Sequence, residues 1–252
     1  MIEIFFLSII QGLTEFLPIS SSSHLILVSK YFNFDNQSLS IDVSLHIGSF
    51  LGVIFYFKKD IFNFIKNKEL FFKIIISSIP VMIAGFVLIK LNLIDQIRNI
   101  KIIGWTTLIF GILLYISDKF PARNKIKNSF NYKSVFIIGF FQILSLIPGV
   151  SRSGITITAA RFLDFKREES AKISFLLSIP TLAAVSLFGI INLTNNNSLD
   201  ISLINISSII LSFIFSLITI KYFLQYIKKF SLSIFVGYRV VLGLIILFFA
   251  YL

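Results

Sequence analysis

The chain has 252 residues, of which 56% are hydrophobic and only 14% are charged, and its mean hydropathy is +0.90. This composition excludes a water-soluble domain and is typical of a helical protein that crosses the membrane several times. The absence of cysteine excludes disulfides, thiol nucleophiles and cysteine-type zinc sites. The net charge of +11 does not indicate a nucleic-acid partner, because basic residues in a membrane protein first report its orientation.

A series of apolar segments follows along the chain. They cover residues 1–29, 43–57, 70–89, 102–117, 133–162, 171–191, 205–227 and 234–252. The first and the fifth differ from the others, because Pro18 or Pro148 breaks each near its middle and small polar residues follow. A proline stops a helix, and the residues after it can start a new one. Each broken segment is therefore either one kinked span or a re-entrant pair of half-helices.

The distribution of lysine and arginine decides between these two alternatives. If both broken segments are re-entrant and the other six cross the membrane, most of the 23 basic residues lie on one side. The loops on that side are 58–73, 118–133, 161–172 and 221–233, and the other side holds only Lys30, Lys90, Arg98 and Lys101. The positive-inside rule places the basic loops in the cytoplasm and both termini outside. We therefore expect an all-α integral membrane protein with six transmembrane helices plus two re-entrant helix hairpins.

The two broken segments also resemble each other in sequence. The similar stretches are 11–20 with 142–151 and 78–84 with 178–184. In the expected topology the first hairpin enters from outside and the second from the cytoplasm. We therefore expect a single polytopic domain, residues 1–252, whose halves at about 1–117 and 133–252 form an inverted-topology repeat. Such repeats place ligand sites near the membrane midplane, where broken helices meet.

The first broken segment contains a carboxylate, a histidine and four consecutive serines. Ser21 and His24 are three residues apart and can share a helix face, and a histidine next to a hydroxyl can act as its general base. Gln11 and Glu15 are four apart and also share a face. Glu15 could bind Mg²⁺ or Ca²⁺ together with substrate oxygens, or serve as a base. Ser20, nearer the proline, is the expected N-cap.

The second broken segment presents an arginine among hydroxyls, directly after a proline and a glycine. A half-helix beginning near Ser151 offers unpaired backbone N–H groups, which bind anions and above all phosphate. Arg152 adds a planar fork of donors that matches phosphate oxygens, and Ser151, Ser153 and Thr156 add hydroxyls. In a purely structural interpretation these hydroxyls join helices, and Arg152 pairs with Glu15. The convergence of carboxylate, serine, histidine and arginine favours a functional site.

Two other charged side chains give weaker indications. His46 lies early in the 43–57 span and is expected to reach only the interface. Arg239 lies about one helical turn into the last span from its cytoplasmic end, where the default is that the side chain extends to the water.

The stretches Gln11–His24 and Pro148–Thr156 resemble the two signatures of the undecaprenyl-diphosphate phosphatase family, of the bacitracin-resistance type. The resemblance covers nearly the whole chain, including the separation of the signatures and the ending Tyr238-Arg239. It implies an enzyme of the bacterial inner membrane, with inverted repeats and re-entrant helices. Such an enzyme hydrolyses the C55 isoprenoid diphosphate to the monophosphate carrier used in cell-wall synthesis.

The resemblance also implies roles for individual residues. Glu15 would be the acidic residue tied to a divalent cation. Ser21 and His24 would supply the nucleophile and its acid/base partner, although His24 as nucleophile with Glu15 as base is an alternative. Ser151 and Arg152 would bind the diphosphate.

The remaining expectations concern partners and departures from the family pattern. Ser20, Ser153 and Thr156 complete the predicted diphosphate-binding set. Gln11, the second predicted metal ligand, stands where many relatives have glutamate, and Ser23 stands where glycine usually precedes the histidine. The lipid substrate and membrane lipids are the expected partners, a homodimer is a possible assembly, and the active site would face the periplasm. The alternative function is a secondary transporter or lipid scramblase for a phosphorylated substrate.

Overall fold

The computed structural model describes residues 2–32, 38–64, 68–195 and 202–252, and nearly all of them are helical. The helices are α1 (Ile2–Thr14), α2 (Ser21–Phe32), α3 (Leu39–Tyr56), α4 (Lys58–Phe64), α5 (Lys68–Lys90), α6 (Ile94–Ile97), α7 (Ile100–Asp118), α8 (Ile126–Ser129), α9 (Tyr132–Ile143), η1 (Leu144–Leu146), α10 (Arg152–Phe162), α11 (Arg167–Asn195), α12 (Leu203–Lys229) and α13 (Ser233–Tyr251). Within the described residues, the only β pairing is an isolated bridge between Asn124 and Phe165. The predicted all-helical class is confirmed.

Six of the described helices are long and apolar enough to cross a membrane. They are α3, α5, α7, α11, α12 and α13. Each coincides, within a few residues, with one of the six unbroken apolar segments of the sequence. The chain is therefore a multi-pass membrane protein, as the hydropathy pattern predicts.

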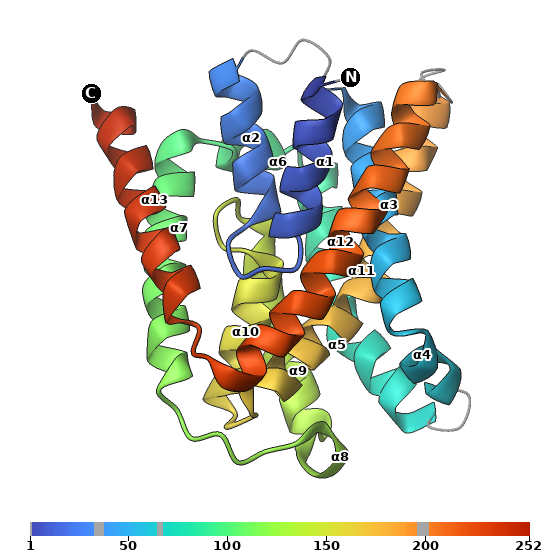
Figure 1. The fold of residues 1–252 in the computed structure, drawn as a ribbon, viewed down its shortest axis with the longest axis vertical. Coiled ribbons are helices and arrows are strands. Elements are labelled where there is room, and N and C mark those ends of the chain that lie inside the picture. The colour runs from blue at the N-terminus through green and yellow to red at the C-terminus, as the bar shows by residue number, and fades with distance from the viewer. Residues whose placement is uncertain (1, 33–37, 65–67, 196–201) are drawn as a thin grey trace.

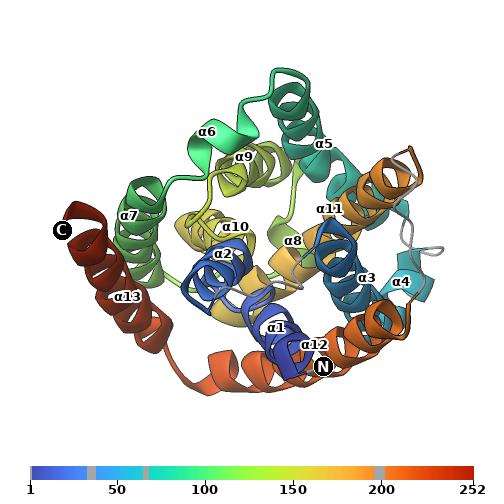
Figure 2. The same ribbon diagram turned by 90° about the horizontal axis from the view of Figure 1, so that it is seen from above.

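The two broken segments form pairs of short helices. In Figure 1, α1 and α2 stand side by side at the end that carries both termini, and their connection turns toward the middle of the molecule. Helices α4 and α8, which belong to the basic side, lie at the opposite end. Figure 2 shows α2 and α10 near the centre, with α5, α7, α12 and α13 around them. The two breaks are thus brought into the interior.

Some helix contacts of the first half have counterparts in the second, whereas within the described residues the contacts of α10 with α11 and α7 have none around α2. Helix α1 packs on α12 as α9 packs on α5, while α3 packs on α11 and α7 on α13. This is the pattern expected if α3, α5 and α7 correspond in chain order to α11, α12 and α13 about a two-fold axis. The similar stretches 78–84 and 178–184 fall on α5 and α11 instead, so that similarity does not follow the chain order of the halves.

Each break ends in a serine with left-handed backbone. Ser20 has φ 77° and Ser151 has φ 71°, and the next residue begins α2 or α10. The Ser151 hydroxyl accepts a hydrogen bond from the Gly154 backbone N–H at 3.1 Å and caps α10, so the predicted helix start near Ser151 is confirmed. The Ser20 hydroxyl instead lies 3.0 Å from the Ser23 hydroxyl. The expectation that the Ser20 hydroxyl caps the backbone of α2 is therefore wrong, because this hydroxyl bonds the Ser23 hydroxyl and not a backbone N–H group.

Arg239 joins the two breaks from α13. Its guanidinium is fully buried and donates to the carbonyl oxygens of Pro18 at 3.2 Å, Gly149 at 2.9 Å, Val150 at 3.1 Å and Thr107 at 3.2 Å. The expectation that Arg239 extends to the water is therefore wrong. Where the helices are broken, carbonyl groups lack intrahelical partners, and a cation with five N–H donors can satisfy several at once.

Candidate active site

A cavity of about 190 Å³ lies where the two breaks meet. Its polar lining comes from both broken segments and from α3 and α11: Thr14, Glu15, Ser20, Ser21, Ser22, His46, Ser145, Ser151, Arg152 and Thr181. Its apolar lining consists of Val81, Leu146, Leu182 and Val185. Predicted residues of both signatures thus face one space, whose lining is part polar and part apolar.

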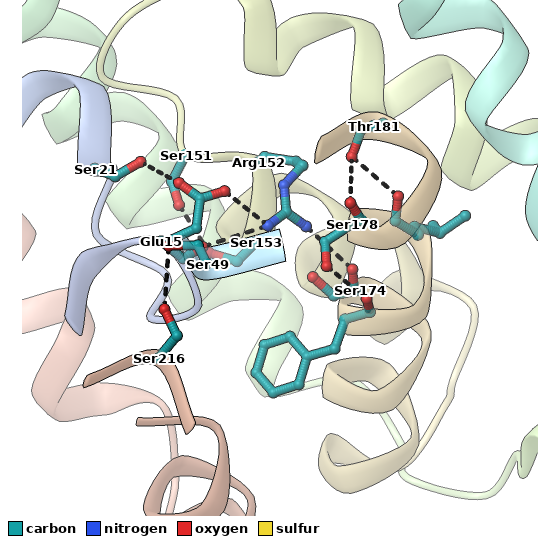
Figure 3. A network of polar contacts seen from close by, with 12 residues as sticks. Glu15, Ser21, Ser49, Ser151, Arg152, Ser153, Ser174, Ser178, Thr181 and Ser216 are labelled. Atoms are coloured by element: carbon teal, nitrogen blue, oxygen red, sulfur yellow. Dashed lines mark hydrogen bonds and ion pairs between the residues drawn. The ribbon is translucent and has the colours of Figure 1, made fainter. Parts of the chain in front are cut away.

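Glu15 is the centre of the hydrogen-bond network in this cavity (Figure 3). The Ser21 hydroxyl donates to Glu15 Oε2 at 2.7 Å, and the Arg152 guanidinium donates to Glu15 Oε1 at 3.1 Å. Gln11 Nε2 donates to Oε2 at 3.1 Å from one turn earlier on α1. The carboxylate is nearly buried and is compensated by the arginine of the other hairpin. The predicted convergence of Glu15, Ser21 and Arg152 is observed.

Arg152 occupies the first position of α10, directly after the Ser151 cap. Its guanidinium also donates to the Ser174 carbonyl oxygen of α11 at 3.1 Å, which fixes its direction. The first backbone N–H groups of α10 therefore lie beside a guanidinium at the cavity wall. A helix N-terminus combined with an arginine is a strong binding arrangement for phosphate.

His24 makes no hydrogen bond to the Ser21 hydroxyl, and both of its ring nitrogens have other partners. Its Nδ1–H donates to the Ser20 carbonyl oxygen at 2.6 Å, so neutral Nε2 accepts from the Tyr238 hydroxyl at 2.6 Å. The two rings are stacked, with centroids 5.7 Å apart. The sequence paired His24 with Ser21 by helical spacing, whereas the structure brings the Glu15 carboxylate to the Ser21 hydroxyl. The group placed to accept the Ser21 proton is therefore Glu15.

Two hydroxyls of the second signature connect structural elements. Ser153 donates to the Leu17 carbonyl oxygen of the other break at 2.7 Å, and Thr156 donates to the Ser174 hydroxyl at 2.7 Å. Both side chains are buried, and neither lines the cavity. The Ser153 contact joins the two breaks and the Thr156 contact joins α10 to α11, which agrees with the structural interpretation of isolated hydroxyls.

The residues predicted to hold a cation fit that role in part. Gln11 Oε1 is buried without a hydrogen-bond partner, because the amide nitrogen must face the carboxylate. An orphaned carbonyl oxygen beside a carboxylate is a suitable pair of ligands for Mg²⁺ or Ca²⁺. Among the residues that the structure describes, no three acidic or histidine side chains form a metal cluster. Any cation held by Glu15 and Gln11 would therefore share its coordination with substrate oxygens.

Five polar lining residues were not assigned to the site from sequence: Thr14, Ser22, His46, Ser145 and Thr181. His46 was expected at the interface, yet it lines the cavity together with Thr181 of α11. For His46 the available signal was an ionisable side chain inside an apolar segment, which is costly unless it faces a polar interior. Thr181 directly follows Pro180 inside α11, and no sequence signal identified it.

The fold and this cavity define a class of protein: a polytopic helical membrane protein with an intramembrane site suited to phosphate. Residues 4–245 match the family described as "Bacitracin resistance protein BacA". The chain is 50% identical over 251 residues to an undecaprenyl-diphosphatase of Pelagibacter ubique, covering 99% of this chain and 98% of the relative. It is 40% identical to one of Roseobacter denitrificans and 38% identical to one of Jannaschia sp., with at least 96% of each chain covered. The chain belongs to the BacA family.

Proposed function

We propose that the chain hydrolyses undecaprenyl diphosphate to undecaprenyl phosphate and inorganic phosphate. This reaction recycles the lipid carrier for cell-wall synthesis, and it would confer bacitracin resistance. The observation that carries the proposal is the contact of Ser21 with Glu15, and of Glu15 with Arg152, inside one cavity. The names of the relatives support the same reaction.

The first chemical step uses the two close contacts of Glu15. Ser21 Oγ attacks the terminal phosphorus, its proton passes to Glu15, and the bond from phosphorus to the bridging oxygen breaks. Undecaprenyl phosphate leaves, and the terminal phosphoryl group stays on Ser21. Arg152 and the N-terminus of α10 stabilise the charge on the phosphoryl oxygens, which is the main contribution of a protein to phosphoryl transfer.

The second step releases phosphate. Water attacks the phosphoserine, the bond from phosphorus to Ser21 Oγ breaks, and Oγ takes its proton back from Glu15. A divalent cation held by Glu15 and Gln11 would neutralise charge on the substrate oxygens. The apolar lining of Val81, Leu182 and Val185 faces the space where the first isoprene units would lie.

The proposed setting is the bacterial inner membrane, with the cavity reached from the periplasm. In this setting α1 with α2, and α9 with α10, are re-entrant hairpins that enter from opposite sides, and the two halves form an inverted repeat. The positive-inside rule supports this orientation, because the loops near α4 and α8 are rich in lysine and arginine. The corresponding helix contacts of the two halves support the repeat.

Substitution of Ser21 tests the proposed chemistry. Ser21→Ala removes the nucleophile and should lower kcat by about three orders of magnitude or more, measured as phosphate released from purified protein and C55 diphosphate. Ser29→Ala is the matched control on α2, because its hydroxyl bonds the Leu25 carbonyl oxygen one turn earlier. Normal turnover by Ser21→Ala would refute serine catalysis and leave His24 as the leading nucleophile.

A further inference from the structure

His46 reaches the catalytic cavity from α3. It is the eighth residue of that helix, roughly 10 Å along the axis from the helix start at 1.5 Å per residue. The side chain is only partly buried and lines the cavity together with Glu15, Ser21 and Arg152. The expectation that His46 reaches only the interface is therefore wrong, because α3 carries it into the interior beside the first break.

The direction of the imidazole ring is fixed by one hydrogen bond. His46 Nδ1 lies 2.8 Å from the Asp42 carbonyl oxygen, and a carbonyl oxygen can only accept. Nδ1 therefore carries the hydrogen, and Nε2 of the neutral ring carries the lone pair. Within the described residues no hydrogen bond engages Nε2, whereas both nitrogens of His24 have partners. His46 thus presents an unused acceptor.

The helix that carries His46 is held rigidly. Ser49 lies 3.1 Å from the hydroxyls of both Ser212 and Ser216 on α12. Gly48 lies so close to α12 that an added Cβ would approach the Ile209 carbonyl oxygen to 2.4 Å. Close packing of this kind leaves α3 little room to shift. The position of His46 is therefore set before substrate binds.

The hydrolysis of the phosphoserine requires an acceptor that Glu15 cannot supply. In phosphoryl transfer the attacking and leaving oxygens lie roughly in line on opposite sides of phosphorus. Glu15 is bonded to Ser21 Oγ itself, which places it on the side of the leaving oxygen. The water must approach from the other side, and the Arg152 guanidinium cannot accept a hydrogen bond from it.

His46 comes to the cavity from a different helix than Ser21. Helix α3 packs mainly against α12 and α11 and less extensively against α1, whereas Ser21 begins α2, which packs against α1. Resting on the proposed function above, we propose that His46 Nε2 accepts a hydrogen bond from the hydrolytic water and orients it for in-line attack on the phosphoserine. A side chain can position a water in this way without removing its proton. In some phosphoryl-transfer enzymes a glutamine orients the attacking water in the same manner.

Two amide substitutions separate the two nitrogens of His46. His46→Asn keeps a donor near the position of Nδ1, so the bond to Asp42 can persist, but it is too short to replace Nε2. His46→Gln offers a carbonyl oxygen near the position of Nε2. The assay uses C55 diphosphate labelled in its terminal phosphate, rapid acid quench and mapping of label on the protein. Leu51→Ala is the control, because Leu51 is exposed on the lipid side of α3.

For His46→Asn we expect the first equivalent of undecaprenyl phosphate at the wild-type rate, label retained on Ser21, and phosphate release slowed about 100-fold, as for a misplaced reactant. His46→Gln and Leu51→Ala should release phosphate at nearly the wild-type rate without retained label. Wild-type turnover by His46→Asn, a slow His46→Asn that retains no label, or a His46→Gln as slow as His46→Asn would each overturn the proposal. Normal turnover by Ser21→Ala would refute the serine mechanism itself.

Discussion

Removal of the Arg239 side chain should unfold the junction between the two breaks. The guanidinium makes five hydrogen bonds to carbonyl oxygens at 2.9–3.5 Å. A hydrogen bond to a charged group contributes roughly 1.5–3 kcal/mol, and buried groups left without partners cost a similar amount. These contributions are not additive, and single substitutions rarely exceed 4–5 kcal/mol. We therefore expect Arg239→Ala to lower the free energy of unfolding by about 4 kcal/mol.

The assay is unfolding of the purified protein in mixed micelles with increasing denaturing detergent, followed by loss of helicity. Arg239→Lys should lie between Arg239→Ala and wild type, because an ammonium has three donors and no planar fork. Arg98→Ala removes an exposed arginine and should change stability by less than about 0.5 kcal/mol. If Arg239→Ala unfolds within about 1 kcal/mol of wild type, Arg239 does not hold the two breaks together.

Two further predictions concern the cation and the orientation. Chelator treatment should abolish phosphate release, and added Mg²⁺ or Ca²⁺ should restore it. The reason is that Glu15 carries the single carboxylate of the described cavity lining and the substrate is polyanionic. Full activity in the presence of chelator would show that Glu15 acts only as a base. The chain has no cysteine, so single cysteines at exposed Asn128 and Asn195 report topology directly. They should be labelled from opposite sides of the membrane, and labelling from the same side would refute the proposed topology.

The arrangement of spans could be predicted from sequence because hydropathy and proline act locally. The six long helices follow from apolar segments of sufficient length, and Pro18 and Pro148 mark both breaks. Arg152 was recognised as a site residue because a charge at a break is costly without a partner. The ion pair of Arg152 with Glu15 was anticipated only by the purely structural interpretation of the sequence.

The directions of single side chains could not be predicted, because they depend on contacts between distant segments. Helical spacing pointed His24 at Ser21, yet its Nε2 bonds Tyr238, which lies 214 residues away. Position near a helix end predicted that Arg239 extends to the water. Instead, unpaired carbonyl oxygens of both breaks accept hydrogen bonds from the Arg239 guanidinium. They come within its reach only when the two breaks pack against α13.

The most direct test of the proposed activity is product analysis with purified protein in phospholipid vesicles that contain C55 diphosphate. The account predicts inorganic phosphate and C55 monophosphate in equal amounts, with the reaction lost in Glu15→Gln, which cannot accept the Ser21 proton. Movement of intact diphosphate between the two leaflets without release of phosphate would contradict the account and indicate a transporter or scramblase.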